Sequence, residues 1–220
     1  AGAYANTTGG GEDMIGFCYG VPGLEGGELI HWSHMLAVVP DWRGKGIAGR
    51  LKRAQREFVR QQGIRRICWT YDPLESVNAF FNLVRLGARP YRYERDFYGD
   101  GSFSVLSQGL GTDRLLVAWS TQADEAGSTA VADEEIPDLA RIPDVIDQDL
   151  KVHFVASPLG VAIPIPMGIQ TLKVEAPARA RRWRSAQRSA FEHYFSRGYV
   201  VRTLRQPGKN RLSAYILVPQ

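Results

Sequence analysis

The 220-residue sequence contains only two cysteines, Cys18 and Cys68, both in apolar surroundings and without C-x-x-C spacing. Two isolated cysteines cannot supply the disulfide framework of a small secreted domain, so we expect reduced core thiols in a cytoplasmic protein. No apolar run approaches the roughly 20 residues of a membrane span, and no charged-then-apolar leader opens the sequence. We therefore expect no membrane partner.

Histidine is also scarce, and its spacing excludes another class of site. The four histidines lack a convincing metal-ligand pattern, so we expect no metal. They are His31, His34, His153 and His193. No motif supports Ser-His-Asp or Cys-His chemistry either.

The composition is that of an ordinary globular protein, with 44% hydrophobic and 23% charged residues. A chain of this length can bury one substantial core, or one domain with a sizeable extension. The net charge of +4 fits a polyanionic ligand and fits nucleic acid equally well, so charge alone does not choose between them.

The most informative stretch runs from His34 to Lys52, HMLAVVPDWRGKGIAGRLK. An apolar run over Met35–Val39 that stops at a proline predicts a buried strand. A helix is predicted to follow, with the apolar face Ile47, Leu51, Ala54 and Phe58. Its basic residues are expected largely on the other faces, at Arg50, Lys52, Arg53, Arg56 and Arg60.

The junction between this strand and this helix predicts a phosphate site. A helix N-terminus carries free N–H groups and the positive end of the helix dipole, and Gly44 and Gly46 let an anion approach the backbone. Arg43, Lys45 and Arg50 add positive charge. The spacing is neither a Walker loop nor the three-glycine dinucleotide fingerprint.

A second block follows this helix, which is predicted to end near Gln62 before Gly63. Branched and aromatic residues over Arg66–Tyr71 predict a strand. The next helix, Leu74–Leu86, is predicted to begin with Asp72 as its N-cap and to end at Gly87.

Together these blocks resemble the GNAT acetyltransferase superfamily. Its signature, Arg/Gln-x-x-Gly-x-Gly/Ala, is matched by Arg43, Gly46 and Ala48, and residues 69–88 (WTYDPLESVNAFFNLVRLGA) resemble a later motif. With the phrase Ser33-His34-Met35-Leu36, they look like a bacterial branch of predicted GNAT acetyltransferases with a C-terminal extension. The resemblance covers most of the chain.

The resemblance implies an α/β fold with a mixed α+β sheet, splayed central strands, helices on both faces and a C-terminal α+β extension. A GNAT domain ordinarily begins with a strand and one or two helices, for which this sequence has no room. We expect that part of the fold to be absent from these residues.

The resemblance also implies the chemistry. Acetyl-CoA, or another acyl-CoA, would be the co-substrate, and an amine acceptor would attack it directly in a ternary complex. The pyrophosphate would bind residues of the loop and helix start, namely Arg43, Gly44, Lys45, Gly46, Ile47, Ala48 and Gly49. The backbone of Leu36, Ala37 and Val38 would pair with the pantetheine amides, and a strand N–H would stabilise the oxyanion. Asn78 is favoured over Asn82 as a further cofactor contact, because a buried amide needs a partner.

The catalytic residues are less clearly marked. His34 is the first candidate for the general base, because it enters the motif strand beside the thioester and its ordinary pKa suits the task. Glu28 and His31 are alternatives. The tyrosine that many GNAT enzymes place four residues before the terminal glycine is Leu83 here. The acid is therefore either water alone or a nearby tyrosine that could substitute, namely Tyr71, Tyr91, Tyr93 or Tyr98.

The remaining sequence predicts three segments: an acyl-CoA-binding core over residues 1–120, an acidic connector over 121–149, and an α+β extension over 150–220 that completes the sheet or forms a second lobe. The extension contains strands over Val152–Ala156 and Gly160–Ile165, broken at Ser157-Pro158. Its long helix, Ala176–Arg197, has a basic stripe that we interpret as a solvated face. The stripe consists of Arg179, Arg181, Arg182, Arg184 and Arg188. This lobe could form a homodimer interface.

Two other functions remain open. A CoA-binding regulatory module without catalysis would explain Leu83 and the lack of an unmistakable base. A nucleic-acid-binding protein would use the basic stripe, but no aromatic stacking platform accompanies it, so this hypothesis ranks last. The acceptor, whether a small molecule or a peptide amine, is not specified by the sequence.

Overall fold

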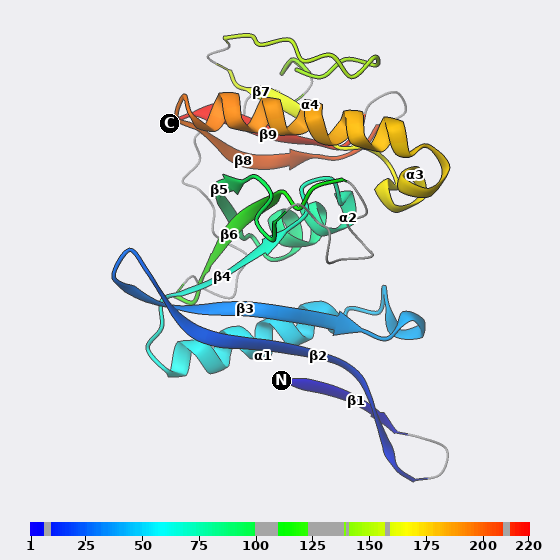
Figure 1. Cartoon of the computed structure of the whole chain (residues 1–220). Helices are drawn as coiled ribbons and strands as arrows, with labels where there is room; N and C mark the ends of the chain where they lie inside the picture. The colour runs from blue at the N-terminus through cyan, green and yellow to red at the C-terminus, as the bar shows by residue number, and fades with distance from the viewer. Residues whose placement is uncertain (7–9, 100–109, 123–138, 140, 157–158, 209–211) are drawn as a thin grey trace. The chain divides into compact units, whose positions relative to one another are not determined.

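The computed structural model describes residues 1–6, 10–99, 110–122, 139, 141–156, 159–208 and 212–220 (Figure 1). The chain divides into two compact units. Unit 1 comprises Ala1–Trp69 and Ala118–Thr129, and unit 2 comprises Thr70–Val117 and Ala130–Gln220. These units cut across the three predicted segments, because residues 70–117 group with the C-terminal residues. Most of the predicted acidic connector, residues 123–138 and 140, lies outside the described residues.

The described residues form a mixed α+β fold. A mixed sheet has the strand order β1-β2-β3-β4-β6-β5, and a separate three-stranded sheet has the order β7-β9-β8. The helices are α1 to α4, with one π-helical segment, η2, after α2. None of the described helices combines the length and the apolar character that crossing a membrane requires.

Unit 1 is built on an antiparallel meander, drawn in blue in Figure 1: β1 (Gly2–Asn6), β2 (Glu12–Glu25) and β3 (Glu28–Val38). Strand β2 continues through Pro22 to Glu25, and Pro22 pairs with His31. Proline is tolerated there because β1 pairs with β2 only as far as Phe17, so the outer edge of Pro22 faces no strand.

Helix α1 (Ile47–Gln61) begins and ends where the sequence predicts. Its first turns place Ile47 and Leu51 against Ile15 and Cys18 in a small core. The predicted apolar face is wrong in its second half: Phe58 is 58% exposed, whereas Val59 is fully buried. Ala54 is exposed as well.

The residues that take the place of Ala54 and Phe58 on the buried face of α1 are polar. Lys52 and Gln55 are both buried, and they bond to side chains of β3. A pattern based on apolar residues alone assigns such positions to solvent.

The predicted buried strand over Met35–Val39 forms as the end of β3, but it is not buried. Met35 is 49% exposed and Val39 is 43% exposed. The physical reason is that β3 pairs with β4 (Arg66–Tyr71) only through His31 and Trp32. Beyond Trp32, no described strand covers that edge of β3.

In unit 2, the predicted helix over 74–86 forms as two segments: α2 (Ser76–Ala79) and the π-helix η2 (Phe80–Arg85). Asp72 accepts a hydrogen bond from the Leu74 N–H at 2.9 Å, as a residue at a helix start should. The burial that favoured Asn78 over Asn82 as a cofactor contact is not observed, because Asn82 is buried and Asn78 is exposed. The π-helical segment changes which side chains face inward.

The rest of unit 2 contains β5 (Arg89–Glu94), part of β6 (Arg114–Ser120), α3 (Ile169–Glu175) and α4 (Pro177–Phe195). Strands β7 (Val161–Pro164), β8 (Tyr199–Arg205) and β9 (Ala214–Pro219) form a sheet of their own. The predicted strand over 152–156 is wrong, since only an isolated bridge between Ile146 and Val152 forms there. The predicted break at residues 157–158 lies outside the described residues.

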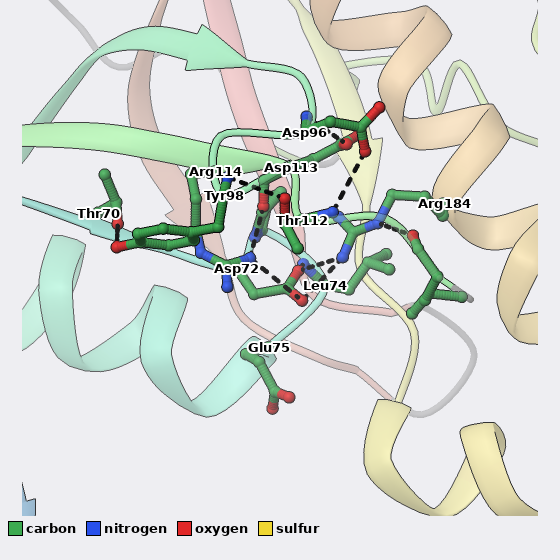
Figure 2. A network of polar contacts seen from close by, with 12 residues as sticks. Thr70, Asp72, Leu74, Glu75, Asp96, Tyr98, Thr112, Asp113, Arg114 and Arg184 are labelled. Atoms are coloured by element: carbon green, nitrogen blue, oxygen red, sulfur yellow. Dashed lines mark hydrogen bonds and ion pairs between the residues drawn. The ribbon is translucent and has the colours of Figure 1, made fainter. Parts of the chain in front are cut away.

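The basic stripe of α4 is not simply a solvated face, which corrects the prediction. Arg184 is buried and donates to both carboxylate oxygens of Asp72, at 2.8 and 2.7 Å (Figure 2). Arg188 pairs with Asp113 and Asp96. These ion pairs attach α4 to the β4–α2 connection and to the β5–β6 region, which explains why residues 70–117 group with the C-terminal residues.

The Asp113 carboxylate is fully buried. Burial alone would raise its pKa, but hydrogen bonds from Arg188 and Tyr93 outweigh that effect and hold the pKa of Asp113 below its ordinary value. The carboxylate therefore stays ionised within unit 2.

Candidate functional site

The loop between β3 and α1 has the geometry of an anion site. A single 3₁₀ turn, η1 (Pro40–Trp42), leads into Gly44 and Gly46, whose φ angles are +74° and +79°. Nothing lies within 4 Å of the position that a Cβ atom would take at either glycine. The backbone at the start of α1 is therefore open to a ligand, and its first N–H groups have no partner within the helix.

Cationic side chains surround this loop. Arg43 donates from Nε to the Val38 carbonyl oxygen at 3.1 Å, which holds its side chain beside the end of β3. The Lys45 ammonium lies 4.8 Å from the centre of the Trp42 ring. Arg43, Lys45 and Arg50 are all exposed. The helix dipole and three cations therefore favour a negatively charged group here.

The unpaired edge of β3 leads directly away from this loop. From Val38 back to Ser33 the strand covers about 17 Å at the usual rise of 3.3 Å per residue. No described strand pairs with this edge beyond Trp32. An extended ligand that bears amides can pair with such an edge as an added strand does.

A β-bulge interrupts β3 at the far end of this edge. Tyr19 pairs with Met35 and Gly20 pairs with Ser33, so His34 is the extra residue. A bulge leaves the extra residue out of the ladder and redirects its side chain. The exposed His34 ring meets the Tyr19 ring edge-on, with their centres 6.3 Å apart.

The other predicted catalytic residues do not gather around His34. Glu28 lies six residues along β3, about 20 Å away by the strand rise, and its carboxylate pairs with Arg66 at 2.9 Å. His31 is buried beneath α1, where its Nε2 lies 3.2 Å from the Gln55 amide nitrogen. Burial and the neighbouring Lys52 lower the pKa of His31.

Two predicted residues belong to unit 2. The Tyr71 side chain is buried, and burial raises its pKa well above the ordinary value, which makes it a poor proton donor. Asn78 is exposed at the start of α2. One strand–loop–helix segment of unit 1 thus carries His34 and the predicted cofactor-binding residues from Leu36 to Gly49, whereas Glu28 lies apart from them.

Sequence reasoning missed a buried polar cluster behind this segment: His31, Ser33, Lys52 and Gln55. The Lys52 ammonium lies 2.9 Å from Ser33 Oγ and 3.1 Å from Gln55 Oε1. One signal could have revealed it, since Ile47, Leu51, Gln55 and Val59 follow strict i, i+4 spacing and form a single stripe on α1. Within the described residues, no three His, Cys, Asp or Glu side chains gather as metal ligands would.

The described part of unit 1 is an α+β domain in which a strand–loop–helix segment leaves a helix N-terminus open and surrounded by cations. A family model, described as an acetyltransferase (GNAT) domain, matches residues 3–85. Residues 3–85 are therefore a GNAT acetyltransferase domain. A comparison with curated proteins found no match.

Solved structures give matches of low overall similarity. The structure of the NatC complex bound to Gag peptide and CoA has 19% identity and a TM-score of 0.40, covering 49% of this chain and 61% of that one. A GNAT-family acetyltransferase from Desulfovibrio desulfuricans has 19% identity and a TM-score of 0.40, covering 50% and 62%. NAA60 from Arabidopsis thaliana, in complex with a bisubstrate analogue, has 21% identity and a TM-score of 0.42, covering 53% and 70%. The chain thus spans about three fifths of the first two proteins.

Proposed function

We propose that this protein is an acyl-CoA-dependent N-acyltransferase, with acetyl-CoA as the simplest donor and an amine as the acceptor. The observation that carries the proposal is the continuity of one segment of unit 1. The open start of α1 at Gly46 lies next to the end of β3 at Val38. From there, the unpaired edge of β3 runs back along the strand to the bulge at His34.

The donor would lie along this segment. The pyrophosphate would bind the N–H groups and cations from Arg43 to Gly49, and the pantetheine amides would pair with the β3 backbone from Val38 back to Leu36. The thioester would then reach the bulge. There, a backbone N–H left out of the ladder would donate to the carbonyl oxygen as negative charge develops on it.

The reaction would proceed by direct attack. The neutral amine nitrogen forms a bond to the thioester carbonyl carbon, and collapse of the tetrahedral intermediate breaks the carbon–sulfur bond. The amine loses one proton, and the departing CoA thiolate gains one. His34 would accept the amine proton, because it is the exposed ionisable side chain at the bulge. Glu28, His31 and Tyr71 are set aside by their distance, their burial or their raised pKa.

Donor binding is tested by replacing Gly46 with aspartate. A Cβ atom at this position meets no atom within 4 Å, so the variant adds negative charge at the proposed anion site, and the backbone strain of a non-glycine residue at positive φ is shared by the control below. Gly63→Asp is a matched control at the other end of α1, because Gly63 also has a positive φ and open space around it. Calorimetric titration with CoA should show at least tenfold weaker binding for Gly46→Asp, or about 1.4 kcal/mol, and wild-type affinity for Gly63→Asp. Equal affinity in both variants would refute the site.

Catalysis is tested with His34→Ala. Release of the CoA thiol is followed with a thiol reagent across a panel of amines, and both cysteines of the protein are buried and so contribute little background. Loss of a general base should lower turnover by about 10²- to 10⁴-fold while the affinity for CoA stays unchanged. If the wild type binds CoA but transfers acetyl neither to any amine of the panel nor to water, the protein is instead a CoA-binding regulatory module.

A further inference from the structure

Lys52 is a buried lysine in the second turn of α1, and only 2% of its surface is exposed. Its ammonium donates to Ser33 Oγ at 2.9 Å and to Gln55 Oε1 at 3.1 Å. The same nitrogen lies 3.6 Å from the centre of the Trp69 ring, within the range of a cation–π interaction. These contacts account for the three N–H bonds of the ammonium.

These contacts join the two strands at the point where they separate. The last paired residues are Trp32 of β3 and Cys68 of β4. Ser33 and Trp69 are the next residue on each strand, and Lys52 contacts both. The side chain thus lies at the fork of β3 and β4, immediately before the unpaired edge of β3 begins.

Within the part of the chain that the structure describes, no carboxylate compensates the charge of Lys52. Among the described residues, none of the ion pairs involves Lys52. The titratable groups that face it are the Cys18 thiol of β2, which donates to the Leu51 carbonyl oxygen, and the His31 imidazole of β3. On β4 it meets the Trp69 ring, and on its own helix the neutral Gln55. Burying a lysine without a counter-ion is costly, so a packing role alone would favour an apolar residue here.

We propose that Lys52 is a positioning residue for the acyl donor: its ammonium, held between Ser33 of β3 and Trp69 of β4, fixes the fork and keeps the edge of β3 open for pantetheine. This inference rests on the proposed CoA-binding function. The bulge at His34 follows Ser33 directly, so the same contact also fixes the start of the bulge.

A pH dependence follows from this arrangement. Burial lowers the pKa of Lys52 to about 7, while the nearby Cys18 opposes this effect. Above that pH the neutral amine keeps its hydrogen bonds to Ser33 and Gln55 but loses the cation–π contact with Trp69. Donor affinity should therefore fall as the pH rises through 7, and by linkage a bound donor should raise the pKa of Lys52.

The test uses dephospho-CoA as the probe, because it lacks the 3′-phosphate that would itself titrate in this range. Dissociation constants are measured at pH 6.0 and 8.5 for the wild type, for Lys52→Met and for Arg60→Met. Arg60 is a matched control, since it is a cation on the same helix whose exposed side chain pairs with its neighbour Glu57. We expect affinity in the wild type to fall at least threefold between the two pH values. We expect Lys52→Met to bind about tenfold more weakly at pH 6.0 and to show no pH dependence, and Arg60→Met to match the wild type.

Two results would overturn the inference. The first is that Lys52→Met binds with wild-type affinity at both pH values. The second is that it binds weakly but with the pH dependence of the wild type. The second result would make Lys52 a structural residue only. The wild type provides a test that needs no variant: the fluorescence of the tryptophans should titrate near pH 7, and saturating dephospho-CoA should move that midpoint upward. A wild type that titrates in this way but binds no CoA would refute the proposed function, and the donor role of Lys52 with it.

Discussion

The stability of unit 1 should rise with pH because of Lys52, and the size of the effect follows from its burial. The ordinary pKa of lysine is 10.5, and the folded value is about 7. Between these values the unfolded chain binds more protons than the folded one, so the free energy of unfolding increases with pH. Integrated from pH 7 to pH 9.5, this single group adds about 3 kcal/mol to the free energy of unfolding.

Lys52→Met removes this contribution without shortening the side chain much. At pH 6, the substitution has two opposing effects on the free energy of unfolding: it removes the cost of burying a cation, and it removes the hydrogen bonds of Lys52 to Ser33 and Gln55. At pH 9.5, only the second effect remains. The difference in unfolding free energy between the wild type and Lys52→Met should therefore change by about 3 kcal/mol across this range, in favour of the wild type at high pH.

Urea denaturation followed by tryptophan fluorescence provides the assay. Four of the five tryptophans belong to unit 1, so the signal reports mainly on that unit. They are Trp32, Trp42, Trp69 and Trp119. Other groups that titrate between pH 7 and 9.5 are common to both proteins and cancel in the difference. A difference that stays constant with pH would show that Lys52 does not change its ionisation on folding, and the reasoning would be refuted.

Three further predictions concern packing and charge. Val59→Ala should lower the free energy of unfolding by about 1–2 kcal/mol and Phe58→Ala by less than about 0.5 kcal/mol, because only Val59 is buried; urea unfolding distinguishes them. Arg184→Met should lower the free energy of unfolding by about 3 kcal/mol, because the Asp72 carboxylate loses its close partner and keeps only the longer 3.9 Å pair with Arg114. Arg179→Met on the exposed side of α4 should lower it by less than about 0.5 kcal/mol. Acid should destabilise unit 2, because the lowered pKa of Asp113 gives stability that is present above pH 3.8 and is lost as the pH falls further. Asp113→Asn should therefore flatten that part of the acid unfolding curve.

The parts of the fold that the sequence predicts correctly depend on local signals. The limits of α1 and β4 follow from glycine, proline and branched residues within a few positions of each boundary. The glycine-rich turn before α1 was predictable for the same reason, and Gly44 and Gly46 adopt the positive φ angles that favour glycine. The GNAT domain match over residues 3–85 covers this same region.

The errors share a different physical origin: each depends on a partner far away in the sequence. Arg184 appears to belong to a solvated stripe until Asp72, 112 residues earlier, is placed beside it. The apolar pattern of α1 assigns Lys52 and Gln55 to the surface, because it contains no information about their hydrogen bonds to Ser33 and His31 of β3. No periodicity of apolar residues can reveal a buried polar group, because the energy that permits its burial comes from the other element.

These two observations meet in α1. The N-terminus of this helix lies at the proposed anion site, and its second turn places Lys52 at the fork of β3 and β4. Because an α-helix turns 100° per residue, the rotation that seats Ile47 and Leu51 in the core also determines where Lys52 points. A change in the packing of α1 would therefore disturb the phosphate loop and the pantetheine edge together. The core contacts of one helix therefore set both ends of the proposed donor site. The Lys52 ammonium adds to this coupling, because it contacts Ser33 of β3 and Trp69 of β4 at the same time.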